Sequence, residues 1–208
     1  TTFDFNPWFR LNKNEDSSTV LSHFIDYQFN YSGNFSKYTD AYSGSQSFYN
    51  VFYLDTVSTK DSTHWRIINN GLNYTLKINP IHTKLKIGYK NEINQVYQYL
   101  DSTFMNHIVN AGLYVSKNKY TGFVKANYVA QGSNQNDYSL EIGNCFSDKL
   151  PWVTMKNKGT IGFIVKFNAS IEKRRPDFIF NNWVSNHYVW NNNFSPIDKQ
   201  QALFSIST

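Results

Sequence analysis

The chain has 208 residues, of which 40% are hydrophobic, 18% aromatic and only 17% charged. No stretch approaches the roughly 20 apolar residues of a membrane-spanning helix, and the aromatic content excludes a disordered chain, so a β-rich protein remains, either soluble or in an outer membrane. The net charge of +5 is dispersed, and its densest cluster, Lys173–Arg175, is typical of a solvated loop and predicts no nucleic-acid partner.

The first strong pattern is a strict alternation over residues 21–32, where Leu21 and Ile25 share one parity and Ser22 and Asp26 the other. This period of two predicts a strand. The same alternation returns over residues 72–79 and 84–90. Between them, Asn79-Pro80-Ile81-His82 predicts a tight turn, because proline cannot join a central β-ladder.

Further along, alternation over 105–115 and 120–130 predicts a hairpin around the link 116–119. Residues 138–146 predict a weaker strand and residues 161–171 a clear one. With 48–55, 178–190 and 202–206 added, we expect about ten strands, and no segment of ten or more residues has sustained helical periodicity. The predicted fold class is all-β, with 1–208 forming one domain.

The length of the apolar faces favours a membrane, because soluble strands are usually about 5 to 6 residues long and membrane strands about 9 to 11. Short links at 79–82 and 116–119 alternate with longer polar ones at 91–103 and 131–137, as in outer-membrane barrels. The link 147–157 breaks this alternation because it should be short. We therefore predict an antiparallel up-and-down transmembrane β-barrel, with a soluble sandwich as the alternative.

Strand parity assigns each residue to a face. The polar parities predict lumen-facing Lys77, Lys84, Lys86, Lys90, Lys125, Lys166, Asp26, Glu92 and Glu141. The apolar parities predict lipid-facing Leu21, Ile25, Leu72, Leu76, Leu85, Ile87, Leu113, Val115, Val124, Phe163, Val165 and Phe167. Rings gathered toward strand ends predict interfacial aromatic residues at Tyr27, Phe29, Tyr31, Tyr97, Tyr99, Tyr188 and Trp190.

The sequence offers no catalytic signature. The five histidines have no metal-binding spacing, and neither a P-loop nor a G-x-S-x-G or G-x-G-x-x-G motif occurs. Cys145 is the sole cysteine, so no internal disulfide can form. We predict that the protein is not an enzyme and has no catalytic residues, metal site or cofactor.

Two segments carry a family resemblance: Phe48-Tyr49-Asn50-Val51-Phe52-Tyr53-Leu54-Asp55-Thr56 with Lys60-Asp61-Ser62-Thr63, and Pro176-Asp177-Phe178 through Asn186-His187-Tyr188-Val189-Trp190-Asn191-Asn192-Asn193-Phe194. Both resemble the putative porin family of Bacteroidota outer membranes. The resemblance implies a porin-like barrel in a bacterial outer membrane, in contact with lipid. Because family members are longer and this chain ends without a terminal aromatic residue, we expect an incomplete stretch of a larger barrel, with a closed ten-strand barrel as the alternative.

Three functions follow as hypotheses. The first is passive passage of small solutes. The second is a structural or accessory barrel subunit that binds other outer-membrane proteins. The third is a soluble carbohydrate-binding sandwich in which exposed Trp and Tyr rings stack on sugars.

Overall fold

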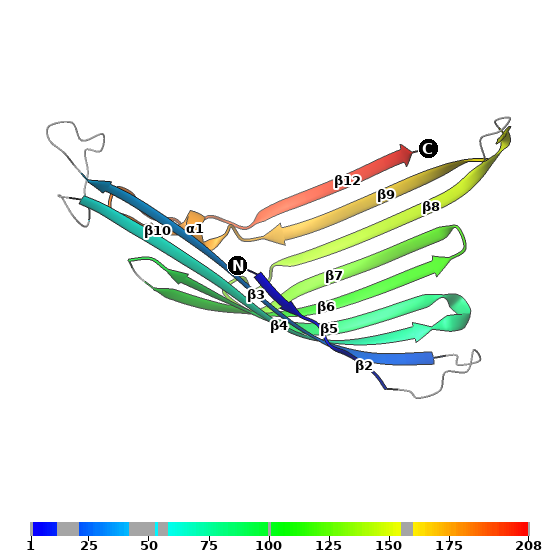
Figure 1. The fold of residues 1–208 in the computed structure, drawn as a ribbon, viewed down its shortest axis with the longest axis horizontal. Coiled ribbons are helices and arrows are strands. Elements are labelled where there is room, and N and C mark those ends of the chain that lie inside the picture. Colours follow the sequence, from blue (N-terminus) through cyan, green and yellow to red (C-terminus); the bar gives the residue numbers. More distant parts are fainter. Residues whose placement is uncertain are drawn as a thin grey trace.

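The computed structural model describes residues 2–11, 21–41, 53, 58–99, 101–154 and 160–207, without the side chains at 40, 41, 80, 149–154 and 160–163. Its main feature is one large antiparallel sheet in which successive strands pair in chain order (Figure 1). Eight long strands of this sheet, together called the wall below, are β3 (Leu21–Ala41), β4 (Ser58–Ile78), β5 (Thr83–Tyr97), β6 (Ser102–Lys117), β7 (Tyr120–Gly132), β8 (Tyr138–Thr154), β9 (Thr160–Arg174) and β12 (Ile197–Ser207). The predicted all-β, up-and-down class is confirmed.

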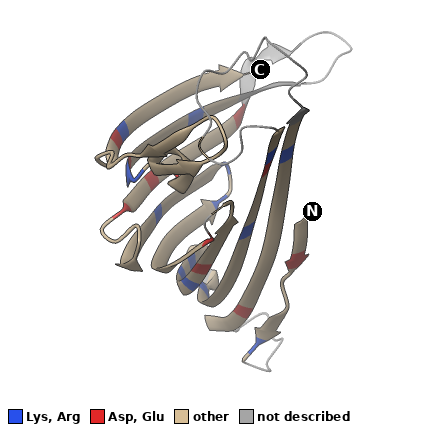
Figure 2. Cartoon of the chain, turned by 90° about the vertical axis from the view of Figure 1, so that its left-hand side faces the viewer, with Lys and Arg blue, Asp and Glu red and all other residues tan. Residues whose placement is uncertain are grey.

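The first edge of the sheet is an interrupted strand made of β1 (Thr2–Phe5) and β2 (Trp8–Arg10), both paired with β3. The two segments keep one register, with Phe5 opposite Phe29 and Trp8 opposite Asp26. Pro7 separates them, yet its carbonyl still accepts a hydrogen bond from the Tyr27 N–H at 3.1 Å. The other edge is β12, and the described strands form an open, curved sheet (Figure 2).

The connections at one end of the sheet are short. A single 3-10 turn, η1 (Asn79–Ile81), joins β4 to β5, and a two-residue turn joins β6 to β7. The expected long link 147–157 is wrong, because β8 runs to Thr154 and β9 begins at Thr160. The link between these two strands is therefore limited to residues 155–159.

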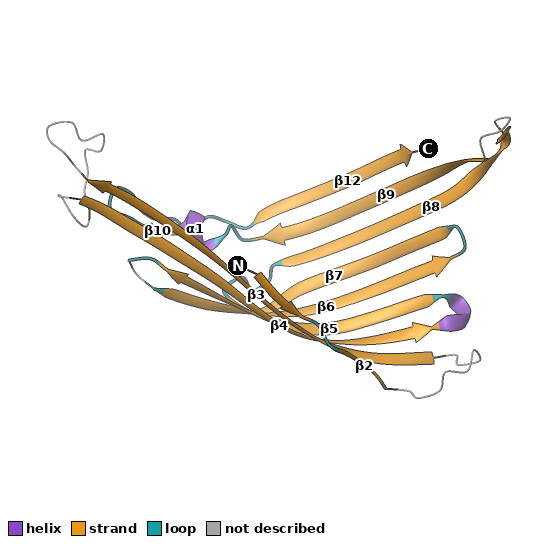
Figure 3. Ribbon diagram, viewed as in Figure 1, coloured by secondary structure: helices purple, strands orange, loops and turns teal. Residues whose placement is uncertain are grey.

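At the opposite end, the expected long link 91–103 is also wrong, because β5 runs to Tyr97 and β6 begins at Ser102 (Figure 3). Its Asn, Glu and Gln residues form an extended strand despite their polarity, since both neighbours supply a full β-ladder. The predicted strand 48–55 lies, apart from Tyr53, outside the described residues.

The connection between β9 and β12, residues 175–196, is called the inner loop below. It contains α1 (Phe178–Asn181) and a small hairpin of β10 (Asn182–Val184) and β11 (Val189–Asn191). The predicted continuous strand 178–190 is therefore wrong. The chain reverses after Val184, where Ser185 and Tyr188 exchange hydrogen bonds, and the hairpin is held by stacked Trp183 and Trp190 rings 5.7 Å apart.

Burial in this sheet is inverted relative to a water-soluble protein. Among the described residues, Val96 is the single buried hydrophobic side chain, whereas ten polar or charged side chains are buried. Asn73 and Asn106 are 4% and 1% exposed, while Leu72 and Ile87 on the other face are 54% and 51% exposed. The polar parity occupies the concave face and the apolar parity the convex face.

Candidate functional site

The concave face carries ion-paired side chains from the strands β3, β5, β7 and β8. Three lysine–carboxylate pairs lie on it, with Nζ–O distances of 3.2 to 3.6 Å: Lys86 with Asp26, Lys90 with Glu92, and Lys125 with Glu141. The side chains of all six are partly exposed, so each pair neutralises charge locally without adding much stability.

Asparagine amides fix these carboxylates. The pattern is the same at each acid, with a side-chain Nδ2 group donating to a carboxylate oxygen at 2.8 to 3.4 Å: Asn73 to Asp26, Asn94 and Asn106 to Glu92, and Asn168 to Glu141. Hydrogen bonds to a charged acceptor are stronger than neutral ones. Each acid of the concave face is therefore held in a small polar cluster by a lysine and by at least one asparagine.

Two further lysines on this face have a different environment. Lys77 on β4 and Lys84 on β5 are directly opposite each other. Among the described side chains, no carboxylate forms an ion pair with either one. Instead, the Lys77 ammonium lies 4.6 Å from the Phe24 ring centroid and the Lys84 ammonium 5.0 Å from that of Tyr114.

Two glycines make room for aromatic rings of this face, Gly112 on the same strand as its ring and Gly143 on the adjacent strand. A Cβ at Gly143 would lie 2.4 Å from Phe123 Cε1, and one at Gly112 would lie 2.8 Å from Tyr114 Cε2. The two rings are therefore packed over backbone that has no side chain of its own. This packing keeps bulky rings against the wall of the concave side.

The inner loop lies over the concave face at the end opposite the short turns. Phe178 stacks on Phe104 of β6 with ring centroids 5.2 Å apart. Farther along, the Val184 N–H donates to Gln98 Oε1 at 3.2 Å, and the Asn186 N–H donates to Asp61 Oδ1 at 3.0 Å. The loop thus crosses from β9 and β12 to β4.

A polar cluster, which we call the latch (Thr59, Asp61, Asn186 and His187), fastens the inner loop to β4, and Thr59, Asn186 and His187 are buried. Asn186 Nδ2 donates to Thr59 Oγ1 at 3.0 Å, and that hydroxyl also lies 2.7 Å from His187 Nε2. All three side chains are less than 9% exposed. The Tyr53 N–H donates to the Asn186 carbonyl at 2.8 Å, so a second connection also reaches the latch.

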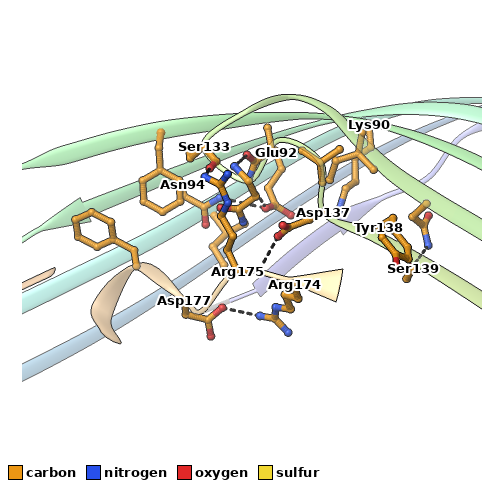
Figure 4. Close-up of a pocket in the computed structure, with 18 of the residues that line it drawn as sticks. Lys90, Glu92, Asn94, Ser133, Asp137, Tyr138, Ser139, Arg174, Arg175 and Asp177 are labelled. Carbon is orange, nitrogen blue, oxygen red and sulfur yellow. Dashed lines mark hydrogen bonds and ion pairs between the residues drawn. The ribbon is translucent and has the colours of Figure 1, made fainter. Parts of the chain in front are cut away.

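Between the inner loop and the wall lies a cavity of about 1540 Å³ (Figure 4). At its rim, the Arg175 N–H donates to Asp137 Oδ2 at 2.8 Å and its guanidinium to the Ser133 carbonyl at 2.6 Å. Arg174 pairs with Asp177 at 2.6 Å. Arg175 therefore ties the start of the inner loop to the β7–β8 connection, whereas the Arg174–Asp177 pair is local.

The structure brings the predicted lumen residues together on one face. The residues assigned to the lumen by parity all occupy the concave parity of the sheet: Lys77, Lys84, Lys86, Lys90, Lys125, Lys166, Asp26, Glu92 and Glu141. The residues assigned to lipid share the convex parity, except that the side chain of Phe163 lies outside the described residues.

The predicted interfacial aromatic residues separate into three groups. Tyr97 ends β5 and Tyr99 follows it, as expected for strand ends. Tyr27, Phe29 and Tyr31 lie in the interior of β3, which continues to Ala41. Tyr188 and Trp190 lie in the inner loop and not on the large sheet, so their placement at a wall strand end is wrong.

Parity reasoning missed the hydrogen bonds from asparagines to the three acids, and it missed the latch. The Asn-His-Tyr segment was visible as a motif, but its partners Thr59 and Asp61 are more than 120 residues away in the sequence. No described helix is long and apolar enough to cross a membrane. The described residues also contain no group of three or more His, Cys, Asp or Glu side chains placed to hold a metal ion.

An up-and-down antiparallel sheet with a polar, loop-covered concave face and an apolar convex face is the wall type of β-barrel channels. A family model described as "Putative porin" matches residues 2–208, and the chain belongs to that family. No curated protein and no solved structure matches the chain.

Proposed function

We propose that the sheet is part of the wall of a channel in a bacterial outer membrane, where the protein passes small solutes without catalysis. The inverted burial carries this proposal: the convex face exposes Leu72 at 54% and Ile142 at 47%, whereas the concave face buries Asn73 and Asn106. A water-soluble sheet would place the apolar face against a second layer. Among the described strands there is no second large sheet to cover it, which disfavours the soluble sandwich.

A row of tyrosines supports a boundary between lipid and headgroups on the convex face. Tyr27, Tyr89, Tyr128 and Tyr138 fall on one cross-strand row, linked through Leu72 and Val109. All four tyrosines are at least 36% exposed. Between the tyrosine row and the short turns, the convex face carries mainly aliphatic residues. Beyond the row, toward the opposite end of the sheet, the same face carries polar residues such as Arg66, Asn91 and Gln95. Amphipathic rings at such a transition are typical of membrane interfaces.

The concave face gives the proposed channel a weak preference for anions. Its predicted lumen set contains six lysines and three acids, and each acid is paired with a lysine. The remaining positive charge raises the local concentration of anions in the lumen. The three lysines that are paired with acids contribute less to the attraction of anions, so the preference for anions is modest.

The inner loop favours a second candidate function, a structural or accessory subunit whose lumen is occluded. The loop is fastened at Phe104, Gln98 and the latch, so it covers part of the concave face. In this alternative the partners are other outer-membrane proteins and no solute passes. Conductance separates the two candidates.

The test uses the full-length protein purified in detergent from outer membranes. We expect it to migrate faster on a gel before boiling than after, and to produce discrete conductance steps in a planar lipid bilayer. Recovery without detergent would refute a membrane wall. A membrane-inserted, heat-modifiable protein without conductance would refute solute passage and favour the accessory subunit.

A further inference from the structure

We propose that Lys77 and Lys84 form a binding site for a small oxyanion, such as phosphate or the carboxylate of a small acid, near the short-turn end of the concave face. The proposal extends the proposed channel function, because it gives the passing solute a chemical class and a place to bind. It rests on a difference in what the lysines of the concave face contact: some pair with carboxylates and others lie against aromatic rings.

Lysines farther from the short turns are compensated by acids. Lys86, Lys90 and Lys125 each lie within 3.6 Å of a carboxylate, so they present a neutral pair to the lumen. Lys77 and Lys84 each contact an aromatic ring where the other lysines contact a carboxylate. A ring face attracts an ammonium through its quadrupole but contributes no negative charge. Counting the described side chains, the two lysines therefore keep a local charge of about +2.

The two charges are also close together. Residues directly opposite on antiparallel strands have Cβ atoms about 4.5 to 5.5 Å apart, and like charges there repel. An oxyanion bound by both ammonium groups would convert this repulsion into two attractions. Each ammonium has three N–H donors, which leaves donors for a ligand beside the ring contact.

Aromatic rings on the flanking strands hold the two ammonium groups. Phe24 belongs to β3, beyond Lys77, and Tyr114 belongs to β6, beyond Lys84. The Tyr114 ring is seated over Gly112 and lies 6.4 Å from that of Phe123. The site thus has two cations held from opposite sides and packed rings along one flank, which suits an oxyanion with several acceptor oxygens.

The experiment measures binding of inorganic phosphate to the detergent-solubilised protein by calorimetry at low ionic strength. The variants are Lys77→Gln, Lys84→Gln and the double variant. The control is the double variant Lys37→Gln/Lys117→Gln, which loses the same two charges from the convex parity. Heat-modifiable migration verifies that every variant is folded.

We expect each single substitution to weaken phosphate binding by about 10-fold, because one charge-assisted hydrogen bond is lost, and the double variant to abolish it. The control should bind as the unmodified protein does. Absent phosphate binding, or equal losses in the control, would overturn the site. The readout needs no conductance, so phosphate binding in a non-conducting protein would refute solute passage while leaving the oxyanion site intact.

Discussion

Ile142→Arg is the sharpest test of which face of the sheet meets lipid. Ile142 lies on β8, 47% exposed, between Val124 of β7 and Ala169 of β9 on the convex face. It is four residues from Tyr138, in the tyrosine row, and four from Phe146 toward the short turns. At about 3.3 Å per residue, both lie about 13 Å away along the strand.

A strand tilt near 40° reduces each separation to about 10 Å of depth, so Ile142 lies close to the middle of an apolar band about 25 Å tall. Arginine at that depth costs about 2 to 4 kcal/mol, which lowers the folding equilibrium constant by roughly 30- to 700-fold. If the convex face met water, the same exposed position would tolerate arginine within about 0.5 kcal/mol.

The assay is urea unfolding of the protein in lipid vesicles, followed by tryptophan fluorescence. Asn127→Arg is the matched control, because it adds the same side chain to an exposed position of the concave face on β7. We expect the control to change the unfolding free energy by less than about 0.5 kcal/mol. Equal effects of the two substitutions, or a loss below 1 kcal/mol for Ile142→Arg, would refute the assignment of the convex face to lipid.

Three further predictions concern the concave side. Gly143→Ala should destabilise the protein by about 1 to 3 kcal/mol in urea unfolding, because its Cβ would meet Phe123 at 2.4 Å, whereas Gly71→Ala, with its nearest atom at 3.6 Å, should be tolerated; equal effects would contradict this packing. Asp61→Ala removes the acceptor of the Asn186 N–H and should raise single-channel conductance, and an unchanged conductance would show that the latch does not narrow the passage. Reversal potentials under a salt gradient should show anion preference that weakens as salt rises, since the Debye length is about 10 Å at 0.1 M, and a cation preference would refute the charge argument.

The faces of the sheet could be predicted from the sequence because a strand has a side-chain period of two. Once Leu72 and Leu76 were placed on one parity, Asn73 and Lys77 had to occupy the other, whatever the length of the strand. The pairing of neighbours followed from the short links, so Lys77 and Lys84 could be assigned to the same face before any register was known.

Strand ends and loop contacts could not be predicted in the same way. The 91–96 segment is too polar to be identified as a strand by hydrophobic alternation, yet each of its residues is paired with both β4 and β6. The inner loop was mistaken for a strand because Trp183, Val184, Val189 and Trp190 favour β-structure in any context, and they do form a hairpin. Its position over the concave face depends on contacts with β4 that no local pattern encodes.

The anchoring of the inner loop depends on the length of β3 and β4. β3 and β4 continue past the tyrosine row to Ala41 and Ser58, and their ladder extends unbroken from Leu21–Ile78 to that end. This extension carries Thr59 and Asp61 to the level where the inner loop crosses, so the latch can form only if the wall continues beyond the apolar band. Shortening β4 would therefore leave the convex face unchanged and remove the anchor of the inner loop. In the proposed channel, the wall meets lipid, and its extension positions the loop that covers part of the concave face.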